Sequence, residues 1–118
     1  MAIYIVEKAL GDVTLLDIRG RVILGSETEA LRSKVRDLLA AGRRWILLDL
    51  GEVSYIDSVG LSTLVACYTS ARKQGGDVKL LHLPRGVHQL LQITRLSTVF
   101  EIYDDVTKAR QSFQEAAS

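Results

Sequence analysis

The sequence predicts a single α/β domain with a largely parallel sheet, and three observations lead to this expectation. The chain has 118 residues, which suits one domain over residues 1–118. Short apolar stretches alternate with helical periods after an opening strand pair, as crossover connections between parallel strands require. No repeat or linker-like stretch divides the chain. We expect a mixed sheet of about five strands with about four α-helices.

The first elements form a hairpin. Residues 3–9 and 13–19 have the composition of strands, and Leu10-Gly11-Asp12 between them is typical of a tight turn. This hairpin supplies the antiparallel part of the sheet. Gly20 ends the second strand, and a loop of sequence RVILG is expected to follow.

A helix and a buried strand come next. Ser26 and Glu29 have the spacing of a capping box, which predicts a helix that begins at Ser26 and ends near Gly42. Residues 45–50, WILLDL, are almost continuously apolar, as in a strand buried on both faces. The helix should turn one apolar face to the core, made of Leu31, Val35, Leu38 and Leu39.

The second half continues the alternation of helices and strands. The pattern predicts a helix from about Val59 to Lys73, a strand over 78–83, a helix from Pro84 to about Ile93 and a short strand near 99–102. Asp104 and Asp105 are expected to cap a last helix. The inner face of that helix should carry Val106, Ala109 and Phe113.

Composition narrows the class of function. Lys and Arg number 15 against 14 Asp and Glu, so the chain lacks the basic surplus of a protein that neutralises nucleic-acid phosphates. A single cysteine, Cys67, excludes an internal disulfide and fits a reducing compartment. No apolar run approaches the length of a membrane span, and the first residues do not resemble a secretory signal. We therefore expect a cytoplasmic protein with no nucleic-acid partner and no membrane span.

The stretch YIDSVGL, residues 55–61, lies where functional groups gather in parallel sheets, just beyond a buried strand. Asp57 and Ser58 could be an ordinary helix cap, a nucleophile or a site that another protein modifies. A serine hydrolase would need a G-x-S-x-G elbow and a histidine base, and the leading glycine is absent. His82 is expected in the core of a strand and His88 on a helix surface, so neither suits a base.

Other chemistry also lacks its residues. The sequence contains neither a phosphate-binding G-x-x-x-x-G-K-[ST] loop nor a G-x-G-x-x-G fingerprint. No histidine and cysteine cluster has metal-ligand spacing. We therefore expect no cofactor, no metal and no catalytic activity.

The helix that follows Ser58 has an unusual outer face. Its core face should be Leu61, Leu64, Val65 and Tyr68, and the opposite face has only small uncharged residues: Val59, Thr63, Ala66 and Ser70, with Cys67 beside them. No charged residue occurs between Ser58 and Ala71, whereas solvated helix faces normally carry several. Either the helix is covered on both sides within the domain or this face receives another protein. We favour the second explanation, with Ser58 and Ser62 along one edge of the face.

A phosphate on Ser58 would act as a switch on such a face. It would add about −1.5 to −2 charges at pH 7. The fold tolerates that charge at a helix N-terminus, but a dry interface does not tolerate it unpaired. Modification could then abolish binding while the fold remains intact.

These residues carry a family resemblance. YIDSVGLSTLV, residues 55–65, resembles the Asp-Ser-x-Gly-Leu motif of STAS domains, in particular the bacterial anti-sigma factor antagonists. Asp57, Ser58, Gly60 and Leu61 match the motif. VTLLDIRGRV at 13–22, the strand at 45–50 and the segment 75–109 are similar to the rest of the family pattern, so the resemblance covers nearly the whole chain.

The resemblance implies a regulator that binds an anti-sigma factor, usually a serine kinase, and so releases a sigma factor. That kinase would phosphorylate Ser58, and a metal-dependent serine phosphatase would reverse the modification. Together with the small uncharged helix face, the motif predicts these partner-binding residues: Asp57, Ser58, Val59, Gly60, Ser62, Thr63, Ala66 and Ser70. One departure is Gly20-Arg21-Val22-Ile23-Leu24, where many members have an acidic residue shortly after the glycine turn, as Gly-x-Leu-Asp. The alternative is a constitutive scaffold or a subunit of a stress-signalling or lipid-transport complex.

Overall fold

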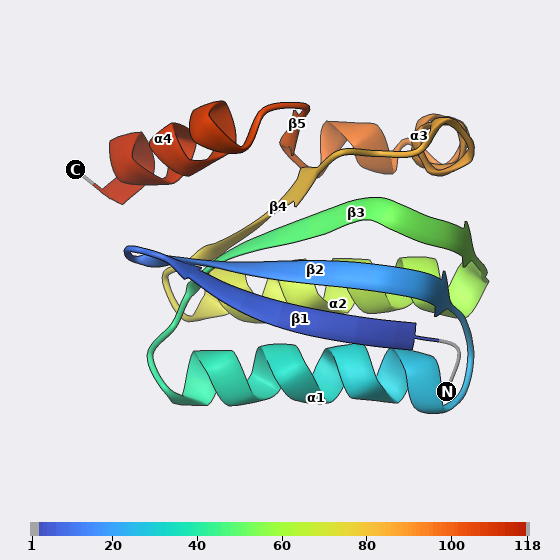
Figure 1. The fold of residues 1–118 in the computed structure, drawn as a ribbon, viewed down its shortest axis with the longest axis horizontal. Coiled ribbons are helices and arrows are strands. Elements are labelled where there is room, and N and C mark those ends of the chain that lie inside the picture. The colour runs from blue at the N-terminus through green and yellow to red at the C-terminus, as the bar shows by residue number, and fades with distance from the viewer. Residues whose placement is uncertain (1–2, 118) are drawn as a thin grey trace.

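The computed structural model describes residues 3–117, with side chains to Gln114, and within that range it has the predicted α/β architecture (Figure 1). The strands are β1 (Ile3–Leu10), β2 (Val13–Val22), β3 (Trp45–Ile56), β4 (Asp77–Leu81) and β5 (Ile102–Tyr103). The helices are α1 (Ser26–Ala40), α2 (Ser58–Lys73), α3 (Arg85–Ile93) and α4 (Val106–Ala117), with a 3₁₀ turn at Leu96–Thr98.

The sheet is mixed, as the sequence predicts. Its strand order is β1-β2-β3-β4-β5, with β1 antiparallel to β2 and every other neighbouring pair parallel. The hairpin is confirmed: Leu10 pairs with Val13, and Gly11 turns the chain at a φ of 65°, which glycine adopts without strain.

Two strands are longer than the sequence predicts, and one is displaced. β2 continues through the expected loop to Val22, and β3 continues to Ile56, because these segments pair with each other. β5 lies at Ile102–Tyr103 rather than 99–102, because the N–H groups of Val99 and Phe100 donate back to the Leu96 carbonyl and only Ile102 and Tyr103 pair with β4. Pairing with a distant segment decides such ends, and local propensity cannot supply that information.

The helices cover the sheet from both sides. Figure 1 shows α1 and α2 on one face and α4 on the other. The predicted core face of α1 is confirmed, since all four of its apolar residues are buried. On the other face Ala109 and Phe113 of α4 pack on Val13, Leu15 and Leu47. Val106 is 39% exposed, so its predicted place on the inner face is wrong; the apolar cluster does not reach the first turn of α4.

The helix starts confirm one predicted cap and overturn another. Asp105 caps α4, because its Oδ1 accepts hydrogen bonds from the N–H groups of Thr107 at 2.7 Å and Lys108 at 3.1 Å. The capping box at Ser26 is wrong. Gly25 is the N-cap residue at a φ of 121°, and Ser26 Oγ donates to Glu27 Oε1 instead of accepting a backbone N–H at the helix start.

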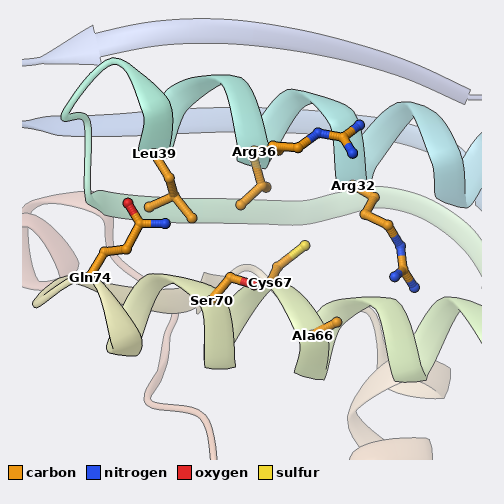
Figure 2. A pocket seen from close by; sticks show the side chains of 8 residues that line it. Arg32, Arg36, Leu39, Ala66, Cys67, Ser70 and Gln74 are labelled. Atoms are coloured by element: carbon orange, nitrogen blue, oxygen red, sulfur yellow. The ribbon is translucent and has the colours of Figure 1, made fainter.

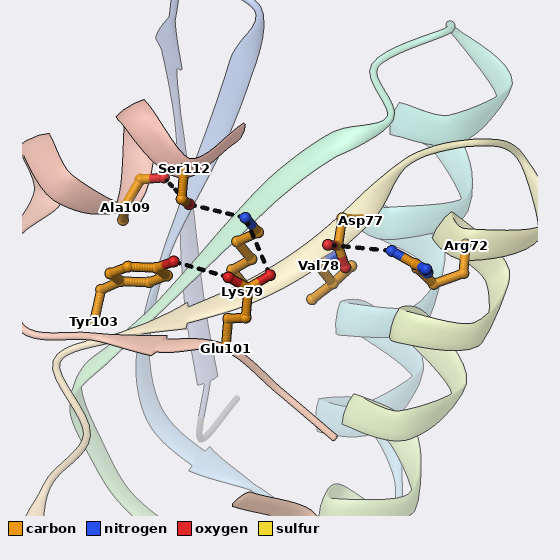
Figure 3. Close-up of polar contacts among 8 residues, drawn as sticks. All are labelled: Arg72, Asp77, Val78, Lys79, Glu101, Tyr103, Ala109 and Ser112. Carbon is orange, nitrogen blue, oxygen red and sulfur yellow. Dashed lines mark hydrogen bonds and ion pairs between the residues drawn. The ribbon is translucent and has the colours of Figure 1, made fainter. Parts of the chain in front are cut away.

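A buried lysine joins α4 to the sheet (Figure 3). Lys79 of β4 has a side chain only 2% exposed, and its Nζ donates to Ser112 Oγ at 2.8 Å. The same nitrogen lies 3.2 Å from Glu101 Oε2 and 4.6 Å from the ring centroid of Phe113. A buried ammonium needs such partners, because burial without them is costly. The pattern VKLLHL gives no sign of this arrangement.

Removing the Glu101 carboxylate should lower the free energy of unfolding more than replacing Lys79. Glu101→Ala leaves the Lys79 ammonium buried with one neutral partner, and we expect it to lower the free energy of unfolding by about 1–3 kcal/mol. Lys79→Met keeps the apolar stem and should cost less than about 1.5 kcal/mol. Urea denaturation of both single variants and the double variant measures the coupling. A larger loss in Lys79→Met than in Glu101→Ala would show that the ion pair is not what matters there.

Candidate functional site at the start of helix α2

The predicted helix start at Asp57-Ser58 is confirmed, and Asp57 is its N-cap residue. Asp57 has an extended backbone, and its Oδ1 accepts a hydrogen bond from the Gly60 N–H at 2.7 Å. This contact satisfies one of the N–H groups that a helix start leaves without an intrahelical partner. The Asp57 carbonyl oxygen also accepts the Leu61 N–H at 2.9 Å, so the side chain and the backbone of Asp57 both hold the first turn of α2.

The second carboxylate oxygen of Asp57 ties a distant loop to the helix. Oδ2 accepts the N–H of Leu24 at 2.9 Å, across 33 positions of sequence. The hydrogen bonds from the N–H groups of Leu24 and then Gly60 lower the pKa of Asp57 below its usual value, since both favour the ionised form. The loop between β2 and α1 therefore lies against the start of α2, with the Leu24 side chain 69% exposed beside it.

Ser58 is the first residue of α2 and is exposed. In the described part of the chain its hydroxyl makes no hydrogen bond; only its carbonyl oxygen does, by accepting Ser62 Oγ at 3.0 Å. A free hydroxyl at a helix N-terminus can be reached by another enzyme. It also lies where the helix dipole favours a negative group.

Two members of the predicted partner-binding set are buried. Gly60 packs so closely that a Cβ there would lie 2.0 Å from the carbonyl oxygen of Val22, at the end of β2. Thr63 has no exposed surface, and its hydroxyl donates to the Val59 carbonyl at 2.8 Å. The predicted exposure of Thr63 is wrong because α2 packs against the sheet and also against α1, which covers a second side of the helix.

The remaining small residues of α2 face a groove beside α1 (Figure 2). Ala66, Cys67 and Ser70 line it from α2, while Leu39 points toward them and Arg32 extends from α1 toward α2. The groove has a volume of about 270 Å³. Cys67 is buried at its base, and this burial raises the pKa of its thiol to about 11, so the thiolate is not formed at neutral pH. Ser70 is exposed and Ala66 and Val59 are half-buried.

The two histidines do not join Ser58. The prediction of His82 in the core is wrong: β4 ends at Leu81, and His82 is exposed at a φ of 56° with Nδ1 3.3 Å from Asp49 Oδ1. His88 is exposed on α3, as predicted. Among the described residues no hydrogen bond links either histidine to Ser58, and no group of three or more His, Cys, Asp or Glu could hold a metal ion.

Sequence reasoning missed two exposed apolar residues near the site. Leu24 lies in a segment predicted only as a loop, and Tyr55, 57% exposed, lies three positions before Ser58 in a segment treated as a connector. Neither carries a motif. Leu24 could be recognised only through its hydrogen bond to Asp57, which joins segments that are far apart in the chain.

Asp57 and Ser58 thus lie at the carboxyl end of a central parallel strand, where the resemblance to STAS domains places its motif. The model of the STAS domain family matches residues 4–109, and the chain belongs to that family. Within residues 3–117 no helix is long and apolar enough to cross a membrane.

The relatives include named regulators. The chain is 36% identical over 72 residues to the anti-sigma-B factor antagonist of Bacillus subtilis, a match that covers 61% of this chain and 65% of that protein. The crystal structure of tm1081 from Thermotoga maritima superposes with a TM-score of 0.84 at 25% identity, covering 93% of this chain and 94% of the other. Phosphorylated SpoIIAA from Bacillus, at 14% identity, shares the fold with a TM-score of 0.72 over 92% of this chain and 99% of the other.

The close approach at Gly60 predicts a large cost for one methyl group. Gly60→Ala would place Cβ against the backbone of Val22, so α2 or β2 must shift, and we expect the free energy of unfolding to fall by about 1–3 kcal/mol. Gly86→Ala is the matched control, because a Cβ there meets no atom within 4 Å. Urea denaturation measures both. Equal stabilities of the two variants would contradict the tight contact.

The lowered pKa of Asp57 predicts a pH-dependent contribution to stability. The folded-state pKa lies below the unfolded value of about 3.9, so the ionised cap stabilises the fold above that pH and the contribution disappears as the pH falls through the folded pKa. The difference in thermal midpoint between the wild type and Asp57→Asn should therefore be full at neutral pH and shrink below about pH 4. A difference that stays constant down to pH 2 would show that ionisation of Asp57 does not matter.

Proposed function

We propose that this protein is an anti-sigma factor antagonist whose binding is switched by phosphorylation of Ser58. The observation that carries the proposal is the exposed Ser58 hydroxyl, which makes no hydrogen bond within the described residues, on a helix start that Asp57 already holds. Membership of the STAS family and the name of the Bacillus subtilis relative support the class of partner. The protein acts by binding in the cytoplasm and catalyses no reaction itself.

The partner is an anti-sigma factor that is also a serine kinase. Its contact surface consists of the exposed or half-buried residues Asp57, Ser58, Val59, Ser62, Ala66 and Ser70. Gly60 and Thr63, which are buried, shape this surface from beneath rather than touch the partner. Leu24 adds an exposed apolar group that Asp57 holds beside Ser58.

The switch follows from local electrostatics. A phosphate on Ser58 gains from the helix dipole, and the neighbouring Asp57 carboxylate already shares its charge with two N–H groups. The fold can therefore accept the modification. A partner that covers the same position would have to bury about −1.5 to −2 charges without a counterion, which is strongly unfavourable. A metal-dependent serine phosphatase restores the binding form.

The proposal predicts one phosphorylated residue. The wild type, incubated with the cognate kinase and ATP, should gain a phosphate that mass spectrometry locates at Ser58 and that Ser58→Ala abolishes. Ser62→Ala is the matched control, since Ser62 is exposed one helical turn away, and should still be phosphorylated. Phosphate on another residue, produced by a kinase of verified activity, would disprove the assignment.

Phosphate mimicry predicts a separation of binding from stability. Ser58→Asp should weaken binding of the anti-sigma factor by at least about tenfold and leave the thermal midpoint nearly unchanged, because the charge sits at a helix N-terminus. Calorimetry of binding and of unfolding measures the two effects. Equal affinities of Ser58→Asp, Ser58→Ala and wild type would instead favour the constitutive scaffold.

A further inference from the structure

The central strand β3 has one edge that the sheet leaves unpaired. β3 pairs with β2 as far as Ile56, but with β4 only as far as the pair Asp49 and Leu81. Figure 1 shows β3 running past the end of β4 toward α3. The last residues of β3 therefore have a neighbouring strand on one side only, although β3 lies in the middle of the sheet.

The hydrogen bonds of this segment confirm the open edge. The N–H of Gly51 donates to Asp49 Oδ1, and Ser54 Oγ donates to the Gly20 carbonyl on the β2 side. In the described part of the chain no backbone hydrogen bond joins residues 52–56 to the chain that follows β4. The Asp57 N–H points to Val22, so by the alternation of strand amides the N–H of Ile56 points the other way, to the open edge.

A groove lies along this edge. Its walls are Val53–Ile56 of β3 on one side and Pro84, Gly86, Val87 and Leu90 of α3 on the other, and its volume is about 390 Å³. Val53, Ile56 and Val87 are buried and Leu90 is half-buried, so the base is apolar. The pairing of β2 and β3 shifts between Gly20 and Arg21, so Ser54 is an extra residue in β3, and Val53 and Ile56 are both buried although they lie three positions apart. An apolar base beside the Ile56 amide fits an extended peptide, whose main chain can pair with the end of the strand while apolar side chains enter the groove.

We propose that this groove receives an extended segment of the partner protein, which adds as a short strand to the end of β3, opposite Tyr55 and Ile56. The segment would place apolar side chains against Val53 and Leu90 and would use its backbone to pair with Ile56. Ile56 immediately precedes Asp57 and Ser58, so the added strand would end beside the proposed modification site. The identity of the partner as the anti-sigma factor rests on the proposed function.

A bulky side chain at Gly86 tests the groove. Gly86 is exposed, and a Cβ there meets no atom within 4 Å, so Gly86→Trp can fill the groove without disturbing the core. We expect it to weaken binding of the anti-sigma factor by about tenfold or more, the equivalent of losing one or two main-chain hydrogen bonds. Gln89→Trp is the matched control, because Gln89 is exposed on the same helix and does not line the groove.

Hydrogen exchange of the wild type gives a second measurement that needs no variant. The Ile56 amide should exchange more slowly in the complex than in the free protein. Amides of β1, which also has an open edge, should keep their rates and serve as the internal control. Slowed exchange at Ile56, together with the loss of affinity in Gly86→Trp alone, supports strand addition.

Other results overturn the inference in distinguishable ways. If the wild type binds, but Ile56 exchanges as before and Gly86→Trp binds normally, the proposed function stands and the groove is not used. A loss of affinity in Gly86→Trp without protection of Ile56 means that the occupant is not a strand. Protection of Ile56 that grows with the concentration of this protein alone means that a second copy occupies the groove. Failure of the wild type to bind the anti-sigma factor overturns the proposed function and the inference together.

Discussion

The two hydrogen bonds to the Asp57 carboxylate hold together the segments around the proposed modification site at Ser58. One comes from Gly60 in the first turn of α2 and the other from Leu24, in the loop before α1. Asp57 also donates its own backbone N–H to the carbonyl oxygen of Val22 at the end of β2. A single residue thus positions a strand end through its backbone, and a loop and a helix start through its side chain, around Ser58. Any change in these contacts would move the Ser58 hydroxyl relative to the rest of the surface.

The uncharged character of α2 has a cause in packing as well as a proposed role in binding. α2 lies between the sheet and α1, which buries Thr63 and Cys67 and leaves no room for charged side chains at those positions. Of the small residues predicted to contact a partner, Ser58, Ser62 and Ser70 are exposed and Val59 and Ala66 are half-buried. The surface is therefore narrower than an entire helix face, and its apolar content depends on Leu24 from outside α2.

The surroundings of the sheet differ between the amino and carboxyl ends of its parallel strands. Toward the amino ends of the parallel strands, α4 covers the face opposite α1 and α2, and Lys79 joins it to the sheet through Ser112 and Glu101. Toward the carboxyl ends, β4 stops at Leu81, His82 turns the chain with a positive φ, and the edge of β3 stays open beside α3. The carboxyl end of β3, which has no strand beside it after Asp49 on the β4 side, is also the end that leads to Ser58. The contacts of α4 and the proposed recognition site therefore lie at opposite ends of the parallel strands.

The order of the elements, the hairpin turn at Gly11, the core face of α1 and the Asp57 cap follow from the sequence alone, because each depends on residues close together in the chain. The motif also placed Ser58 correctly at a helix start. The extent of β3, the burial of Thr63 and Lys79, the exposure of His82 and the position of Leu24 beside Asp57 depend on contacts between distant segments. Tertiary structure decided them, because burial and strand pairing are properties of what packs alongside a residue and not of its neighbours in sequence.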